Sequence, residues 1–316
     1  MYLPYLRGNE FELAALTTLS YTQIFKQGKV LPIIEPVAIT KKCLPKYRRL
    51  AALQTPFILI INPLVGNLTA AGEVNNILVN GVLQGYDGYN LGYLISKFTQ
   101  LDELKQFITA NPDRKISLIH YSLPSFSNDI IVYINSLSTI EHNIILVDNF
   151  NSSYSQSISD SKAKKIILND GFKKQVNNAS YASNPSEFFS DIETEFQKKG
   201  YAGFGDFCTI GEQYNDSKGA RAHAVVIHWT YFKTDSTMID HLVSDDISPE
   251  KDLGGKFGQA YKKLNNLWTT QETAKGTMGS KILENDYGKP GKLPQLGKIK
   301  QLSIMHHMEL MKNILN

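Results

Sequence analysis

Short apolar runs, each ending at a polar residue, recur along the first two thirds of this chain. They occupy 2–6, 30–35, 57–61, 91–95, 115–119, 143–147, 164–169 and 201–205. Continuous apolar runs of this length are typical of strands buried on both faces of a parallel sheet. Segments with helical spacing or helix-starting residues lie between them, at 9–26, 44–53, 69–80, 100–110, 126–138 and 186–199.

Eight strands alternating with helices predict an α/β protein with a (β/α)8 TIM-barrel-like fold, in a single domain over 1–316. A doubly wound open sheet is the competing architecture, because the number of strands does not prove that the sheet closes.

The last third of the chain has a different pattern. Two strand-like segments around 223–231 and 237–244 are separated by a polar turn, and we predict a β-hairpin inserted after strand eight, within 208–250. A helix should follow at about 252–268. If this is the eighth barrel helix, the hairpin forms a lid over the mouth of the barrel. Residues 270–298 show little periodicity and predict a surface excursion, and 300–315 predicts a C-terminal helix.

The polar residues that end the apolar runs mark the predicted site. They are Arg7, Glu35, Asn62, His120, Asp148, Asp170 and Asp206. In a (β/α)8 barrel the carboxyl ends of the strands meet at one mouth, where catalytic groups are found.

Carboxylates that converge in this mouth would repel one another unless a cation or a proton lay between them. Oxygen ligands of this kind suit Mg²⁺ or Mn²⁺, so Glu35, Asp148 and Asp206 form the predicted metal site, with Asp206 also a candidate acid or base. The ordinary alternative is that Asp148 and Asp170 make turns, which we favour for Asp170 and for Asn62 before Pro63.

Two histidines are candidates for proton transfer. His120 ends a strand, and His228 lies in the hairpin, where we expect it to pair with the segment at 240–241. A packed histidine bonded to the backbone is the alternative for both. His306 and His307 point about 100° apart on the last helix and should have surface or packing roles.

Candidate groups for binding a phosphate come from two places. Gly254 and Gly255 expose backbone N–H groups at a helix start, and Lys256 adds a positive charge there. Arg7 and Asn62 could hold or orient a substrate at the mouth, and Arg7 could instead be the cation that compensates the carboxylates there. An ordinary glycine-rich helix start is the alternative for the first group.

Composition limits the classes of protein that remain. A net charge of +3 over 316 residues does not support a nucleic-acid track, and 42% hydrophobic residues suit a globular core. Two widely spaced cysteines, no apolar run long enough for a bilayer and no signal-like start lead us to expect a cytoplasmic protein outside the membrane.

Several segments resemble the phage-type beta protein family, in its bacterial branch. They are 1–16, 31–37, 203–211, 223–231, 242–246 and 302–310, so the resemblance extends over nearly the whole chain. Many relatives have lysine where Arg7 stands. The resemblance implies a phage-conflict setting and no particular reaction, because the family is largely uncharacterised.

Together these features predict a metal-assisted hydrolase of a phosphate-containing substrate, such as a phosphodiester. A non-catalytic barrel that binds a partner protein or a phage component is the alternative.

Overall fold

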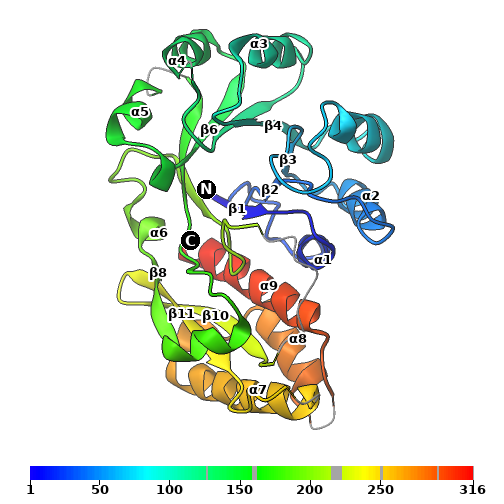
Figure 1. Ribbon diagram of the computed structural model, residues 1–316, viewed down its shortest axis with the longest axis vertical. Coiled ribbons are helices and arrows are strands. Elements are labelled where there is room, and N and C mark those ends of the chain that lie inside the picture. The colour runs from blue at the N-terminus through cyan, green and yellow to red at the C-terminus, as the bar shows by residue number, and fades with distance from the viewer. Residues whose placement is uncertain (126, 159–161, 215–222, 250–251, 290–291, 316) are drawn as a thin grey trace. The chain divides into compact units, whose positions relative to one another are not determined.

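Eight parallel strands close into a barrel in the computed structural model, which describes residues 1–125, 127–158, 162–214, 223–249, 252–289 and 292–315 (Figure 1). The strands are β1 (Tyr2–Leu6), β2 (Ile33–Ile34), β3 (Ile58–Ile60), β4 (Asn90–Ile95), β5 (Ile116–His120), β6 (Ile140–Leu146), β7 (Lys164–Asn169) and β9 (Gly203–Asp206). They follow one another around the ring in this order, and β9 pairs with both β7 and β1. The predicted (β/α)8 TIM-barrel-like fold is confirmed, and the open sheet is excluded.

Helices connect most of these strands, as the periodicity predicted. They are α1 (Glu10–Leu19), α2 (Leu44–Ala52), the π-helix η1 (Asn75–Val82), α3 (Leu101–Thr109), α4 (Ser127–Ser136) and α5 (Ser152–Ser157). A short 3₁₀ turn, η2 (Val147–Asn149), precedes α5. Pro45 lies in the first turn of α2, where its missing N–H costs no helical hydrogen bond.

Close backbone packing explains one glycine of the barrel. A Cβ at Gly205 on β9 would lie 2.3 Å from the carbonyl oxygen of Leu3 on β1, so only glycine fits where these strands close the ring.

The described residues divide into two compact units. The barrel unit comprises Met1–Asn9, Phe25–Asp170 and Glu195–Asp206, and the second unit comprises Glu10–Ile24, Gly171–Thr194 and Phe207–Asn316. The sequence predicted one (β/α)8-like domain over 1–316, whereas the structure divides this range into the barrel unit and the second unit.

A three-stranded antiparallel sheet organises the second unit. Its order is β10 (Val226–Lys233), β11 (Ser236–Val243) and β8 (Ser186–Ser190). The predicted hairpin is confirmed as β10–β11, and positive φ angles at Thr234 and Asp235 form its tight turn. The part of the predicted 208–250 insertion at 215–222 and 250 lies outside the described residues, and the expectation that the hairpin covers the mouth stays a prediction.

The predicted helix at 186–199 is wrong. The segment contains β8 and only a short helix, α6 (Ile192–Glu195). Glu187 and Phe189 are buried while Ser186 and Phe188 are exposed, which is the period of two expected of a strand. Hydrogen bonding to β11 therefore outweighs the helical tendency of this acidic segment.

The predicted surface excursion at 270–298 is also partly wrong. It includes η4 (Glu272–Ala274) and α8 (Met278–Tyr287), which packs on the last helix, α9 (Leu296–Ile314). Gly279 of α8 allows this approach, since a Cβ there would lie 2.4 Å from the carbonyl oxygen of Leu302. Thr277 caps α8 by accepting a hydrogen bond from the Ser280 N–H.

The packing role expected for His306 and His307 on α9 is confirmed, because both are fully buried. His306 stacks on Trp229 with 4.2 Å between ring centroids, and its Nε2 lies 2.7 Å from the carbonyl oxygen of Thr230. Burial lowers the pKa of His306 to about 3. None of the helices in the described part of the chain combines the length and apolar character needed to cross a membrane.

Candidate functional site

Arg7 and Glu35 form a buried ion pair at the ends of neighbouring strands of the barrel. Glu35 Oε2 also accepts a hydrogen bond of 2.7 Å from the Tyr5 hydroxyl, and Oε1 accepts one of 2.9 Å from the Leu64 N–H. The sequence predicted Glu35 as a metal ligand at the mouth, and Arg7 either as a clamp for a substrate or as the cation that compensates the carboxylates. The ion pair with Glu35 agrees with the second alternative for Arg7, because a buried charge requires a partner.

The other residues expected at the mouth also have partners within the barrel unit. His120 contacts the Tyr154 hydroxyl at 2.9 Å through Nδ1 and Asn143 Oδ1 at 3.2 Å through Nε2. Burial lowers the pKa of His120 to about 4, so the ring is neutral at pH 7. Asn62 exchanges two hydrogen bonds with the backbone of Leu94 and thereby extends the pairing of β3 with β4.

Asp206 and Asp148 differ in their surroundings. Asp206 is buried and accepts a hydrogen bond of 2.8 Å from the Tyr2 hydroxyl, whereas Asp148 is exposed on η2. Among the described residues, Glu35, Asp148 and Asp206 do not form a group whose carboxylate oxygens all lie within 4.8 Å of one another. The predicted binding of Mg²⁺ or Mn²⁺ therefore lacks a three-carboxylate cluster.

The predicted phosphate-binding helix start, at α7 (Leu253–Thr270), is occupied by the protein's own groups. The Asp252 side chain accepts a hydrogen bond of 2.8 Å from the Gly255 N–H, and a Cβ at Gly255 would collide with this carboxylate. Lys256 is buried and donates to the backbone carbonyls of His223 and Ser248. The anion that this helix start favours is thus Asp252.

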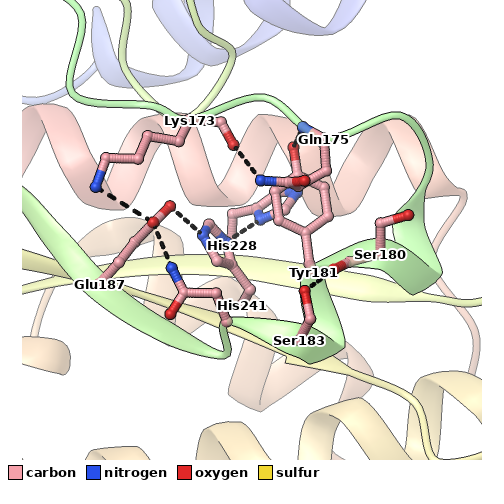
Figure 2. A network of polar contacts seen from close by, with 9 residues as sticks. Lys173, Gln175, Ser180, Tyr181, Ser183, Glu187, His228 and His241 are labelled. Atoms are coloured by element: carbon pink, nitrogen blue, oxygen red, sulfur yellow. Dashed lines mark hydrogen bonds and ion pairs between the residues drawn. The ribbon is translucent and has the colours of Figure 1, made fainter.

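His228 and His241 face each other across the hairpin of the second unit. They are directly opposed residues of β10 and β11, a position that brings two side chains together on one face. Their Nδ1 atoms are 2.7 Å apart, and His241 Nε2 is 3.1 Å from Glu187 Oε1 on β8 (Figure 2). The sequence predicted that His228 would pair with the segment at 240–241, and the structure confirms this.

The positions of the protons in this chain follow from the chemistry of its members. An ionised carboxylate only accepts hydrogen bonds, so we assign a proton to His241 Nε2. A neutral His241 then has a bare Nδ1, which accepts the Nδ1–H of His228. His228 is left with a lone pair on Nε2, the nitrogen that no described residue binds.

Electrostatics keep both rings neutral at pH 7. Burial, the neighbouring His241 and Lys300 together hold the pKa of His228 well below its usual value. Burial also lowers the pKa of His241, although the carboxylate of Glu187 opposes this effect. A neutral imidazole with a free lone pair can accept a proton.

Two further groups contact the carboxylate of Glu187. Its Oε2 accepts a hydrogen bond of 2.6 Å from the Asn184 side chain and lies 3.4 Å from the Lys173 ammonium group (Figure 2). Glu187 is buried, so these contacts are worth more than they would be in water.

Aromatic rings fix the orientation of the two imidazoles. Phe172 and Tyr181 pack against His228 with ring centroids 4.9 and 4.6 Å away, at steep angles. The Tyr181 hydroxyl accepts the Gln175 N–H at 3.0 Å, and burial raises the pKa of Tyr181. The phenol is therefore neutral and has its own proton available to donate.

A cavity of about 470 Å³ in the second unit adjoins His228. Phe172 and Tyr181 line it next to the histidine. Polar groups come from Lys174, Lys300, Gln175, Asn177 and Asn178. This volume falls in the range of small-molecule sites, roughly 300–1,000 Å³. Its position makes the free edge of His228 available to a ligand.

Three members of this site were missed from sequence. Glu187 was assigned to a helix, and Tyr181 and Lys300 stood in segments without a recognisable motif. The sequence of 186–190, SerGluPhePheSer, has no apolar–polar alternation, so it did not indicate a strand with Glu187 on its inner face.

The fold defines a (β/α)8-barrel protein of the α/β class that carries a second unit with an antiparallel sheet. No protein-family model and no curated protein matches the chain. The resemblance to the phage-type beta protein family accordingly rests on the segments quoted above.

Proposed function

We propose that the cavity beside His228 is an active site and that the protein is a hydrolase. The observation that supports this most strongly is the hydrogen-bonded chain from Glu187 through His241 to His228, with its free Nε2 at the cavity. A base oriented by a second group, which is in turn oriented by a carboxylate, is a recurring arrangement in acid–base catalysis.

In the proposed reaction His228 Nε2 takes a proton from a water molecule. The water oxygen forms a bond to the electrophilic centre of an ester-type substrate, and the bond to the leaving group breaks. His228 then returns the proton to the leaving oxygen, so the imidazole ends in its starting state.

The two other groups would act as positioning residues. When His228 is protonated at Nε2, its Nδ1 proton can pass to His241 Nδ1 along the hydrogen bond that joins the two nitrogens at 2.7 Å, and the positive charge then lies beside Glu187. This stabilises the protonated intermediate without moving any side chain.

The proposal keeps the hydrolase class and His228, one of the two histidines expected from the sequence to transfer a proton, and places the site in the second unit instead of at the strand ends of the barrel. A metal ion at the mouth, held by Glu35, Asp148 or Asp206, stays a separate prediction. The non-catalytic alternative treats the Glu187–His241–His228 chain as internal hydrogen bonding that stabilises the sheet.

Hydrolysis of p-nitrophenyl phosphate, bis(p-nitrophenyl) phosphate and p-nitrophenyl acetate tests this function. We expect at least one substrate to be cleaved, a loss of about 100-fold or more in kcat for His228→Gln, and unchanged activity for the exposed control His223→Gln. Equal rates for the wild-type protein and His228→Gln on all three substrates would rule out the proposal and favour the binding alternative.

The variant Glu187→Gln tests whether Glu187 positions the two histidines for catalysis or only stabilises the fold. The amide keeps the shape but can reverse the hydrogen bond to His241, which changes the tautomer of both rings. We expect a lower kcat with a shifted pH profile and an unchanged far-UV spectrum. Imidazole nitrogen NMR shifts should show the Nδ1–H form of His228 in the wild-type protein.

A further inference from the structure

Two buried hydroxyl groups in the second unit have no hydrogen-bond partner among the residues that the structure describes. They are Thr209 Oγ1 and Ser303 Oγ, in side chains that are 4% and 2% exposed. Leaving a buried polar group unpaired costs about 1–3 kcal/mol, so such groups point to a partner that is not part of the chain. Both residues line the cavity beside His228.

The charges around the cavity have one sign. Lys174 and Lys300 line it, and no aspartate or glutamate is among its sixteen described lining residues. Lys300 donates to Glu12 at 2.8 Å, which leaves two of its three N–H protons for another acceptor, and it is close enough to lower the pKa of His228. A ligand with negative charge is therefore favoured here.

The cavity residues offer more hydrogen-bond donors than one carboxylate can accept. The residues that line the cavity carry two hydroxyls, two ammonium groups and the Tyr181 phenol. A phosphate group has three or more oxygens and accepts many hydrogen bonds, whereas a carboxylate has two oxygens.

From this combination we infer that the cavity binds a small phosphorylated molecule, with its phosphate held by Lys300, Ser303 and Thr209. This inference rests on the proposed function in one respect, because it names the class of substrate that the proposed active site would take. It brings back the phosphate-containing substrate expected from the sequence, at residues other than Arg7 and Lys256.

Rings beside the phosphate position would add affinity for an organic group. Phe172 and Tyr181 border the cavity and pack around His228. A substrate with an apolar or aromatic part should therefore bind more tightly than inorganic phosphate.

Ser303→Ala provides the sharpest test, because the hydroxyl has no partner to lose within the described residues. Removing an unpaired buried hydroxyl should leave the melting temperature unchanged or slightly higher. If the hydroxyl serves the ligand, the same variant should bind phosphate about 5- to 10-fold more weakly by isothermal titration calorimetry. Thr209→Val should behave in the same way.

Lys300→Met should weaken phosphate binding by tenfold or more, and Lys312→Met, on the same helix but away from the cavity, is the matched control. Lys300 also compensates the buried Glu12, so a loss of fold in this variant would leave the two hydroxyl variants to decide. Phenyl phosphate should bind more tightly than inorganic phosphate, and acetate more weakly than both.

Two results would overturn the inference. One is equal affinity for phosphate and acetate. The other is wild-type phosphate affinity in Ser303→Ala and Thr209→Val. Failure of the proposed function has a different signature, in which phosphate binds as expected but none of the test esters is hydrolysed. Cleavage of p-nitrophenyl acetate alone, without phosphate binding, would support the proposed hydrolase function and overturn the inference of a phosphorylated ligand.

Discussion

The barrel should lose stability in mild acid because it buries neutral histidines, and His120 is the clearest case. Its ring is fully buried on β5, and both nitrogens have partners inside the barrel unit. Burial lowers its pKa from 6.5 to about 4. The unfolded chain therefore binds more protons than the folded chain between these two pH values.

The size of the effect follows from the two pKa values. The neutral ring of His120 does not reduce the free energy of unfolding at a pH well above 6.5. As the pH falls from 6.5 toward about 4, the unfolded chain takes up the proton first, and the free energy of unfolding decreases. From pH 7 to pH 5, the contribution of His120 to this loss is about 1.8 kcal/mol, calculated from the proton-binding equilibria of the two states. His142, whose pKa burial also lowers to about 4, should add a similar loss.

Urea unfolding of the wild-type protein and of His120→Gln at pH 7 and pH 5 measures this contribution. Both tryptophans, Trp229 and Trp268, lie in the second unit, so fluorescence reports on that unit. Far-UV circular dichroism and hydrogen exchange of β5 should be used for the barrel unit. The glutamine variant should be less stable at pH 7 but lose about 1.8 kcal/mol less on acidification.

The exposed His223 is the matched control, and His223→Gln should keep the wild-type pH dependence. The reasoning is refuted if His120→Gln loses as much stability between pH 7 and pH 5 as the wild-type protein does.

Three further predictions concern the residues that hold each unit together. Arg7→Met should lower the free energy of unfolding by about 3–5 kcal/mol in urea titrations, because it leaves the buried Glu35 carboxylate without its cation. Lys256→Met should lower the melting temperature of the second unit, with a cost of about 2 kcal/mol, because the backbone carbonyls of His223 and Ser248 lose their donor. Replacing Thr234 and Asp235 by Asn-Gly should stabilise the hairpin by about 0.5–1 kcal/mol, since both positions have positive φ.

Exposed residues of the same two units provide controls for the first two predictions. Arg48→Met on α2 and Lys262→Met on α7 should change stability by less than about 0.5 kcal/mol. An effect of Arg7→Met no larger than that of Arg48→Met would show that the ion pair with Glu35 adds nothing to stability. An unchanged melting temperature for the Asn-Gly turn would contradict the argument from backbone strain.

The eight strands were predictable because the centre of each strand is buried and apolar. The apolar runs gave β1 and β7 with their observed bounds, and the others within a few residues. The hairpin was predictable for a similar local reason. Two strands of alternating character flank a short polar turn, and this fixes which residues oppose each other.

The chemistry of the site could not be predicted in the same way. His228 was a candidate from sequence, but Glu187, which contacts its partner His241, belongs to a strand whose local sequence favours a helix. Only pairing with β11 makes it a strand and brings the carboxylate to His241, 54 positions away in the chain.

The mouth residues show the same division between sequence and tertiary structure. The sequence determined that Arg7, Glu35 and His120 lie at strand ends, because the apolar runs stop there. Whether they face a ligand or one another depends on distances between strands that are far apart in sequence. The tertiary structure decided that Arg7 neutralises Glu35 and that His120 bonds to Tyr154, since buried charges and polar groups need partners and the nearest side chains supply them.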